Sequence, residues 1–227
     1  MGVVETEAIV LRTYKLADAD KIVVALTRDR GVVRGVARGA RRLRSRFGAG
    51  LEPLTLVEIA YFEKEGRELA AIKRAEITRS HFALARHTGA WEAAERMCAL
   101  VMEFLPPGQG DERVFRLLRA TLGALEEHPD RHAAMERYFE VWLLRLCGFW
   151  PDVERCAACG RALDGEARWA QGRLICQRCG TGTALDHETQ RALVLAARLG
   201  PAEWAERAGT AQVALLTTDA LARARER

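Results

Sequence analysis

Four cysteines in two C-x2-C pairs restrict the fold of this chain more than any other feature. Cys156 and Cys159 form one pair, Cys176 and Cys179 form the other, and sixteen residues separate the pairs. Two intervening residues let a tight turn aim both sulfurs of a pair at one point about 2.3 Å away. Sixteen residues suffice for a hairpin that brings the two turns together. The spacing therefore predicts a zinc ribbon that holds one Zn2+ ion per chain.

Two other uses of these cysteines are a pair of disulfides and a thiol redox site. Disulfides suit an exported protein, and the N-terminal segment MGVVETEAIV lacks the basic and apolar regions of a secretion signal. A thioredoxin-like redox pair needs a βαβ setting, which neither pair has. Because four sulfur ligands leave no open position on zinc, we expect a structural ion. Cys98 and Cys147 lie on apolar helix faces and are interpreted as core thiols.

The first 80 residues have the pattern of short β-strands. β-branched and apolar residues recur between turn sequences such as Asp29-Arg30-Gly31. The expected strands are Thr6 to Arg12, Lys21 to Thr27, Val32 to Ala37, Thr55 to Phe62 and Glu68 to Ile77. Five strands with an irregular segment between the third and the fourth fit an OB-type barrel. An SH3-like barrel or a small sandwich would give similar spacing.

After residue 80 the hydrophobic period changes from 2 to 3.6, which indicates helices. One helix should end before Pro106, a second should have Asp111 as its N-cap, and a third should run from about Arg131 to Gly148. Helical periodicity resumes at Asp186 to Leu199 and at Thr210 to Arg225. We therefore expect an α+β multidomain protein. An OB-type β-barrel would occupy residues 1–80, and a helical bundle at residues 81–227 would carry an inserted zinc module at 152–182.

Positive charge is concentrated in one stretch of the expected barrel. The formal net charge of +4 is too small to imply nucleic acid, but eight arginines and one aspartate lie between Arg28 and Arg46. The guanidinium group of arginine forms bidentate hydrogen bonds to phosphate oxygens, and flanking glycines let the backbone approach a polyanion. A solvated loop without a partner is the alternative, but a position on an OB barrel favours nucleic acid. The candidate contacts are Arg34, Arg38, Arg41, Arg42, Arg44 and Arg46.

Aromatic residues are sparse in the same region, where only Tyr14, Phe47, Tyr61 and Phe62 occur. A barrel that grips single strands by stacking usually has more. We therefore expect phosphate contacts to dominate, with strong salt dependence, little sequence preference and tolerance of duplex as well as single strands. Phe47 adjoins the arginines and is interpreted as a core residue in preference to a base-stacking one.

The sequence contains no recognisable catalytic constellation. There is no Gly-Lys dipeptide for a phosphate-binding loop, and the five histidines lack metal-ligand spacing. The apolar stretches are shorter than the roughly 20 residues that a membrane span needs. We expect a cytoplasmic protein that is not an enzyme and has no membrane span.

Several short motifs follow one another in a characteristic order. They are Ala37-Arg38-Gly39-Ala40-Arg41-Arg42, Leu51-Glu52-Pro53-Leu54, Glu103-Phe104-Leu105-Pro106 and Gly148-Phe149-Trp150-Pro151, with Cys156-x-x-Cys159-Gly160 directly after. In this order they resemble the RecO family, the recombination mediators of bacterial DNA repair. Some family members lack the cysteines, whereas this chain has all four.

The resemblance implies an N-terminal OB fold, a central helical bundle, a zinc-binding module and a role without catalysis. It also implies binding of single- and double-stranded DNA, annealing of complementary strands, and a RecR partner. With RecR, such proteins help load RecA on strands covered by single-strand-binding protein, which places them at the nucleoid. By position, Arg38, Arg41, Arg42 and Arg44 would contact DNA. Two alternatives are an RNA-binding OB protein and a zinc-stabilised adaptor that contacts only proteins.

Overall fold

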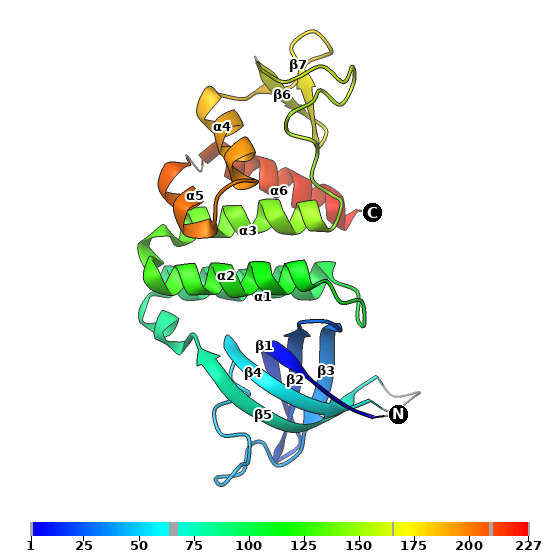
Figure 1. The fold of residues 1–227 in the computed structure, drawn as a ribbon, viewed down its shortest axis with the longest axis vertical. Helices are drawn as coiled ribbons and strands as arrows, with labels where there is room; N and C mark the ends of the chain where they lie inside the picture. Colours follow the sequence, from blue (N-terminus) through cyan, green and yellow to red (C-terminus); the bar gives the residue numbers. More distant parts are fainter. Residues whose placement is uncertain (1, 64–67, 165, 209–210, 227) are drawn as a thin grey trace. The chain divides into compact units, whose positions relative to one another are not determined.

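The computed structural model describes residues 2–63, 68–164, 166–208 and 211–226. Strands come first and helices follow, with three further short strands inserted between two of the helices (Figure 1). The strands are β1 (Val3–Leu16), β2 (Asp20–Thr27), β3 (Gly31–Ala37), β4 (Thr55–Phe62), β5 (Ala70–Ser80), β6 (Ala167–Ala170), β7 (Arg173–Cys176) and β8 (Thr183–Ala184). The helices are η1 (Phe82–Arg86), α1 (Thr88–Phe104), α2 (Glu112–Glu127), η2 (Pro129–Arg131), α3 (His132–Leu146), α4 (His187–Ala196), α5 (Pro201–Arg207) and α6 (Ala211–Arg225). This order confirms the expected fold class.

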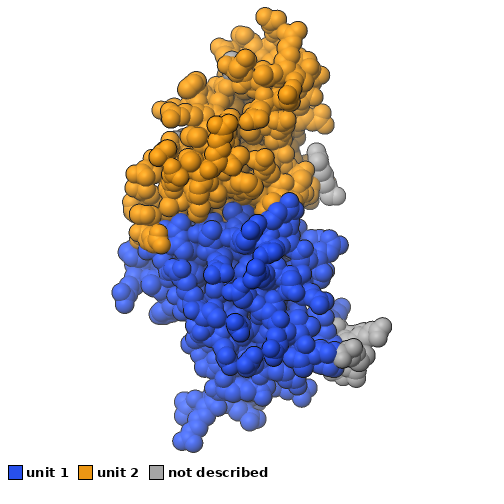
Figure 2. Space-filling view, in the orientation of Figure 1, with its two compact units in different colours: residues 1–126 blue, residues 127–227 orange. Residues whose placement is uncertain are grey.

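The chain divides into two compact units, residues 1–126 and residues 127–227, which Figure 2 shows in blue and orange. The first unit comprises β1 to β5, η1, α1 and nearly all of α2, and the second comprises α3 to α6 with the cysteine module. The change from strands to helices falls at Ser80, where β5 ends. The division into domains at residue 80 stays a prediction. None of the described helices is long and apolar enough to cross a membrane.

The five N-terminal strands form a closed barrel in the order β1-β2-β3-β5-β4. Neighbouring strands are antiparallel except β3 and β5, which run parallel and share the pairs Gly35–Ala70 and Val36–Ala71. A shift of register between Val10 and Arg12 bends β1, so that this strand pairs with both β2 and β4. This five-stranded closed topology is that of an OB fold and resolves the choice between the alternative small β-architectures.

Strand β1 is buried on both faces near its middle. Ala8 and Val10 belong to the core cluster inside the barrel. Ile9 lies on the opposite face because side chains alternate along a strand, yet it is only 1% exposed. Helix α1 contacts β1, so the first helix after the barrel belongs to the same packed unit.

The connection between α1 and α2 also touches the barrel. Pro107 forms an isolated parallel bridge with Val32 of β3. A Cβ atom at Gly31 would overlap the backbone carbonyl of Gln109, and one at Gly110 would overlap the carbonyl of Asp29. Only glycine permits so close an approach of two backbones. The β2–β3 turn and the α1–α2 connection therefore meet without intervening side chains.

Both ends of α2 are fixed by polar contacts. The Asp111 carboxylate accepts the backbone N–H of Arg113 over 2.8 Å, which confirms the expected N-cap. Near the other end, Oε2 of Glu126 accepts from Nη2 of Arg79 over 2.8 Å and lies 2.9 Å from Nδ1 of His81. Burial lowers the pKa of His81, although the neighbouring carboxylate opposes this. The C-terminal end of α2 is thus attached to the end of β5.

In the second unit, two aromatic side chains of α3 donate hydrogen bonds to backbone carbonyls after or at the end of α4. The Tyr138 hydroxyl donates to Leu199 over 2.9 Å, and the Trp142 indole donates to Ala196 over 2.8 Å. The indole of Trp204, on α5, donates to the carbonyl of Ala192 over 2.8 Å. These bonds satisfy the polar atoms of three large rings, of which Tyr138 and Trp204 are buried and Trp142 is half-buried, and they fix the positions of α4 and α5 relative to one another and to α3.

The helices of this unit differ from the expected ones in detail. The periodic stretch from Asp186 corresponds to α4, with Asp186 accepting the N–H of Thr189 as its N-cap. Helix α5 was not expected, because seven residues are too few to show a helical period. The expected start of the last helix at Thr210 lies outside the described residues, and α6 is described from Ala211.

Candidate metal centre and nucleic-acid interface

The four cysteines of the predicted zinc site come together in the second unit. The Sγ atoms of Cys156, Cys159, Cys176 and Cys179 all lie within 4.8 Å of one another. Cys156 is buried, Cys176 is half-buried, and the other two are exposed, so the cluster lies at the surface. The sequence thus identified a group of residues that the fold brings to one point.

Each cysteine pair lies in a tight turn. The N–H of Gly160 donates to the carbonyl of Cys156 over 2.8 Å, and the N–H of Cys179 donates to that of Cys176 over 3.0 Å. Gly160 has a φ of +71°, a value that favours glycine. The φ of Gly180 lies outside the left-handed region, so the second turn does not use its glycine in this way.

A hairpin joins the two turns, as the sixteen-residue spacing predicted. Strands β6 and β7 pair from Ala167–Cys176 to Ala170–Arg173, and β8 adds a short third strand beside β6. The N–H of Ala157 donates to the carbonyl of Leu174 on β7 over 2.8 Å, which attaches the first turn to the hairpin. The third strand was not expected, because two residues carry no visible period.

The donor set and its dimensions fit a zinc ion. Four sulfurs at about 2.3 Å from a tetrahedral ion are about 3.8 Å apart, and the Sγ atoms of Cys159 and Cys176 are 3.8 Å apart. The N–H of Cys176 also donates to Sγ of Cys156 over 3.3 Å, a contact that stabilises a thiolate. The four cysteines can therefore hold a metal ion without rearrangement of the fold.

Thiol acidity in the cluster is uneven. The N–H donated by Cys176 lowers the pKa of the Cys156 thiol to about 6. Hydrogen bonding to the Cys159 and Cys176 sulfurs raises the pKa of Cys179 to about 12. Four sulfurs this close cannot all carry negative charge without a cation among them, because the thiolates repel one another. This requirement is typical of a site that loses protons as it binds metal.

The arginines predicted to bind nucleic acid lie on the first unit. Arg34 is on β3, and the others belong to residues 38–50, which we call the arginine segment. This segment is a series of turns, with hydrogen bonds from Arg42 to Gly39 over 3.1 Å and from Ser45 to Arg42 over 3.0 Å. Its first turn is attached to the barrel, because the N–H of Gly39 donates to Oδ1 of Asp20 over 2.8 Å.

Two of the six arginines contact the protein itself. Nη1 of Arg41 donates to the carbonyls of Ala17 and Asp18, each over 3.1 Å, and so joins the arginine segment to the β1–β2 turn. The guanidinium carbon of Arg46 lies 4.9 Å from the ring centroid of Phe47. A sequence cannot show this division of roles, because both contacts depend on the folded chain.

The other four arginines extend into solvent. Arg34, Arg38, Arg42 and Arg44 are exposed, and none forms an ion pair with the residues that the structure describes. A groove of about 500 Å³ lies beside Arg38, and Leu16 and Asp20 are among its lining residues. Unpaired guanidinium groups on one barrel are able to bind a polyanion through its phosphates.

Two of the four aromatic residues of the barrel region are internal, and a third, Phe62, is half-buried. Phe47 is 3% exposed and belongs to the barrel core, which confirms its interpretation as a core residue. Tyr61 is fully buried, whereas Tyr14 on β1 is half exposed, with the guanidinium of Arg12 6.0 Å from its ring centroid. The barrel therefore offers little aromatic surface for stacking of bases.

One large apolar side chain of the arginine segment is exposed and was absent from the predicted set. Leu43 stands between Arg42 and Arg44 and is completely exposed. The sequence contains a signal for it, since a large apolar residue interrupts a run of arginines and glycines.

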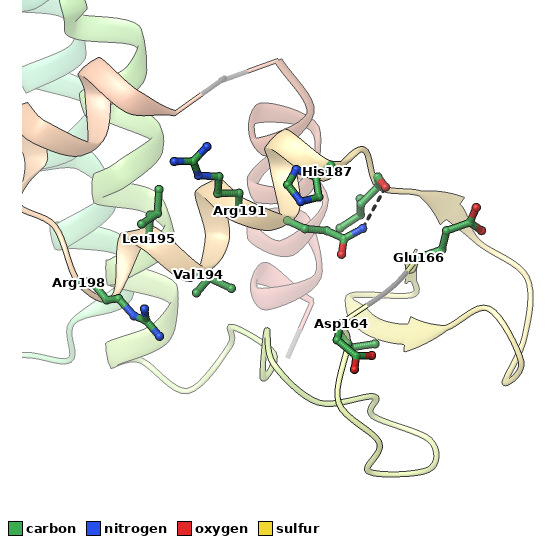
Figure 3. A pocket seen from close by; sticks show the side chains of 10 residues that line it. Asp164, Glu166, His187, Arg191, Val194, Leu195 and Arg198 are labelled. Atoms are coloured by element: carbon green, nitrogen blue, oxygen red, sulfur yellow. Dashed lines mark hydrogen bonds between the residues drawn. The ribbon is translucent and has the colours of Figure 1, made fainter.

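A hollow of the second unit lies beside α4 (Figure 3). Asp164 and Glu166 of the cysteine module contribute carboxylates to it, whereas Arg191 and Arg198 contribute guanidinium groups. Because both signs of charge line this hollow, it offers no continuous positive surface for a nucleic acid.

Comparison with known proteins identifies related chains. Two family models match: "Recombination protein O N terminal" over residues 1–81 and "Recombination protein O C terminal" over residues 90–213. A DNA repair protein RecO of Koribacter versatilis is 37% identical over 163 residues, which are 72% of this chain and 66% of the relative. The chain thus spans just under two thirds of that relative's length.

Other relatives match over a larger share. A DNA repair protein RecO of Rubrobacter xylanophilus is 37% identical over 79% of this chain and 72% of the relative. One of Bifidobacterium longum subsp. infantis is 34% identical over 88% of this chain and 81% of the relative. The family models and these relatives cover the barrel and the helices alike. The chain belongs to the recombination protein O (RecO) family.

Proposed function

We propose that this protein is a DNA repair and recombination mediator that binds single- and double-stranded DNA and anneals complementary strands. The observation that carries the proposal is a set of exposed arginines at β3 and the arginine segment of an OB barrel, none of which forms an ion pair with described residues. The related proteins are named DNA repair proteins, and this supports the proposal. Its role is to position strands, and no bond-making step is assigned to its residues.

The physical basis of annealing is a reduction of phosphate repulsion. Guanidinium groups bind phosphates of either strand irrespective of sequence, and each contact releases condensed counterions. Because Phe47 and Tyr61 are inside the barrel, few rings are available to compete for the bases. Two strands held by their phosphates therefore keep their pairing edges free.

The zinc ion of the proposal is structural. Cys156, Cys159, Cys176 and Cys179 would hold one ion per chain, with no position left for a substrate. When bound, the ion supplies the fixed tetrahedral junction between the two turns. The surrounding module has a small core, in which Leu174 and Ala167 are each 1% exposed, so the metal would substitute for hydrophobic burial.

Family membership suggests the partners. We propose that the protein works with RecR, on strands covered by single-strand-binding protein, and helps to load RecA there. Its place of action would be the nucleoid in the cytoplasm. Among the alternatives, an RNA-binding protein would share the arginine segment, and an adaptor would use the metal module without any nucleic acid.

The first experiment is a titration of a labelled single-stranded oligonucleotide across a salt series. If about five phosphates are contacted, affinity falls roughly a hundredfold between 50 and 200 mM salt. Competition by RNA and by duplex DNA distinguishes a DNA-binding protein from an RNA-binding one. Weak binding without salt dependence would instead favour the adaptor.

An annealing assay tests the proposed activity itself. The double variant Arg38→Glu, Arg42→Glu reverses two exposed charges, and we expect it to anneal complementary strands at least tenfold more slowly. The double variant Arg86→Glu, Arg116→Glu is the matched control, because it makes the same charge change at exposed positions of η1 and α2 in the same unit. Equal annealing by all three proteins would refute the proposed role of these arginines.

A further inference from the structure

Leu43 has no role in the packing of its own unit. It is 104% exposed, more than any other large apolar residue described, so no neighbour covers any part of its side chain. A polar residue at this position would cost no packing contact. The stability of the fold therefore does not account for a leucine at this position.

The protein nevertheless presents Leu43 from a defined support. The hydrogen bonds from Arg42 to Gly39 and from Ser45 to Arg42 close turns on either side of it. Phe47, four residues later, is buried in the barrel core and anchors the segment. Arg41, two residues earlier, is bonded to the β1–β2 turn. An exposed apolar tip on an anchored loop loses little conformational freedom when it is bound.

The neighbours of Leu43 determine what can cover it. Arg42 and Arg44 are both exposed and form no ion pair with described residues, so the tip is an apolar side chain between two positive charges. Their Cα atoms are at most about 7 Å apart, because only one residue intervenes. The two guanidinium groups can therefore reach phosphates on the two sides of a single base step.

We propose that Leu43 inserts between two neighbouring bases of the nucleic acid whose phosphates Arg42 and Arg44 bind. The inference rests on the proposed DNA-binding function and assigns to this residue a contact with the bases. Apolar side chains such as leucine enter base steps as wedges and partly unstack them. Insertion covers the exposed leucine with the apolar faces of the bases and needs no particular sequence, since every base has such a face.

The test uses the full-length protein and an oligonucleotide with two adjacent 2-aminopurines, whose fluorescence rises when the pair is unstacked. Binding of the wild-type protein should raise this fluorescence severalfold. Leu43→Ala should lose most of the rise and weaken binding about tenfold, with the same salt slope, because no phosphate contact is removed. Leu43→Met keeps a long apolar side chain and should keep both signals.

Phe82→Ala is the matched control. Phe82 is an exposed apolar residue, 67% exposed, in the same unit but outside the arginine segment. This variant should behave as the wild-type protein does. Circular dichroism should show that all variants are folded, since each substituted side chain is exposed.

Three outcomes would overturn the proposal while leaving the DNA-binding function intact. The first is salt-dependent binding by wild-type protein without any rise in fluorescence. The second is Leu43→Ala with unchanged fluorescence and affinity. The third is a Leu43→Ala variant that differs from the wild-type protein only in weaker binding to phosphatidylglycerol vesicles. That result would assign the Leu43 side chain to a lipid surface. Absence of all salt-dependent binding by the wild-type protein would instead overturn the proposed function, and the wedge with it.

Discussion

The indole nitrogen of Trp169 donates a hydrogen bond to Oδ2 of Asp219 over 2.8 Å, across fifty residues of sequence. Nε of Arg223 donates to the same oxygen over 2.8 Å. One carboxylate of α6 is therefore shared by its own helix and by strand β6 of the cysteine module. Within the second unit, this contact attaches the module to the helices independently of any metal.

Asp219→Asn should loosen this attachment. The hydrogen bond from Arg223, and then that from Trp169, lower the pKa of Asp219, so the charged form is favoured in the folded protein. That stabilisation is present above the unfolded pKa of about 3.9 and is lost as the pH falls through the lower folded value. Because the pair is partly exposed, we expect a loss of about 2 to 4 °C in Tm at pH 7 and a smaller difference below pH 3. Calorimetry at the two pH values measures both.

Removal of one metal ligand should abolish metal binding. Cys176→Ala leaves three sulfurs, and we expect the zinc content to fall from one ion per chain to nearly none. Amide hydrogen exchange within residues 152–184 should accelerate at the same time. Cys98→Ala is the control, because that buried thiol lies on α1, outside the cluster, and its loss should leave the zinc content unchanged. A full zinc content in Cys176→Ala would contradict the assignment.

Reversal of Arg42 and Arg44 should change the salt dependence of DNA binding. Each lost phosphate contact lowers the slope of log affinity against log salt by about 0.7 for a single strand, so the double variant to Glu should lose about 1.4. Arg41→Gln should act differently, because Arg41 bonds to the β1–β2 turn. It should weaken binding with little change of slope. Fluorescence anisotropy at four salt concentrations distinguishes the two results.

Phe47 should matter for folding and not for contact with bases. Phe47→Ala opens a cavity in the barrel core and should cost about 3 kcal/mol or more in the free energy of unfolding. Phe47→Leu retains most of the volume, should cost about 1 kcal/mol, and should bind oligonucleotides as the wild-type protein does. A marked loss of affinity in the folded Phe47→Leu variant would show that the ring reaches the bases.

His81 should make the first unit less stable in mild acid. Its folded-state pKa is lowered by burial, so below about pH 6.5 the unfolded chain binds a proton that the folded chain does not. The free energy of unfolding should therefore fall as the pH drops from 7 to 5.5. In His81→Gln this part of the pH dependence should disappear. Urea titrations at the two pH values, monitored through hydrogen exchange at β5 and α2, measure this free energy.

The features that the sequence predicted are those whose pattern is local. Two-residue alternation indicated the barrel strands, and the pairs around Cys156 and Cys176 indicated the metal site. Strand β8, with two residues, and helix α5, with seven, were missed because neither is long enough to complete a pattern. Pro201 at the first position of α5 is the signal that was available.

The roles of individual arginines could not be read in this way. Arg41 and Arg42 are neighbours of the same type, yet the guanidinium of Arg41 donates to Ala17 and Asp18, whereas that of Arg42 forms no such bond with the residues that the structure describes. The difference is set by where the β1–β2 turn lies in space, more than twenty residues earlier in the chain. Leu43 is similar, since only the folded loop shows that nothing covers it.

The close approach of Gly31 and Gly110 limits how the parts of this protein can be exchanged. A barrel transplanted from a relative brings its own β2–β3 turn, and that turn must fit a connection between α1 and α2 with no room for a methyl group. Grafts that end at residue 80 therefore separate two surfaces that have to match. Grafts that continue to residue 126 keep them together, and these are the chimeras that should yield well-folded hybrids.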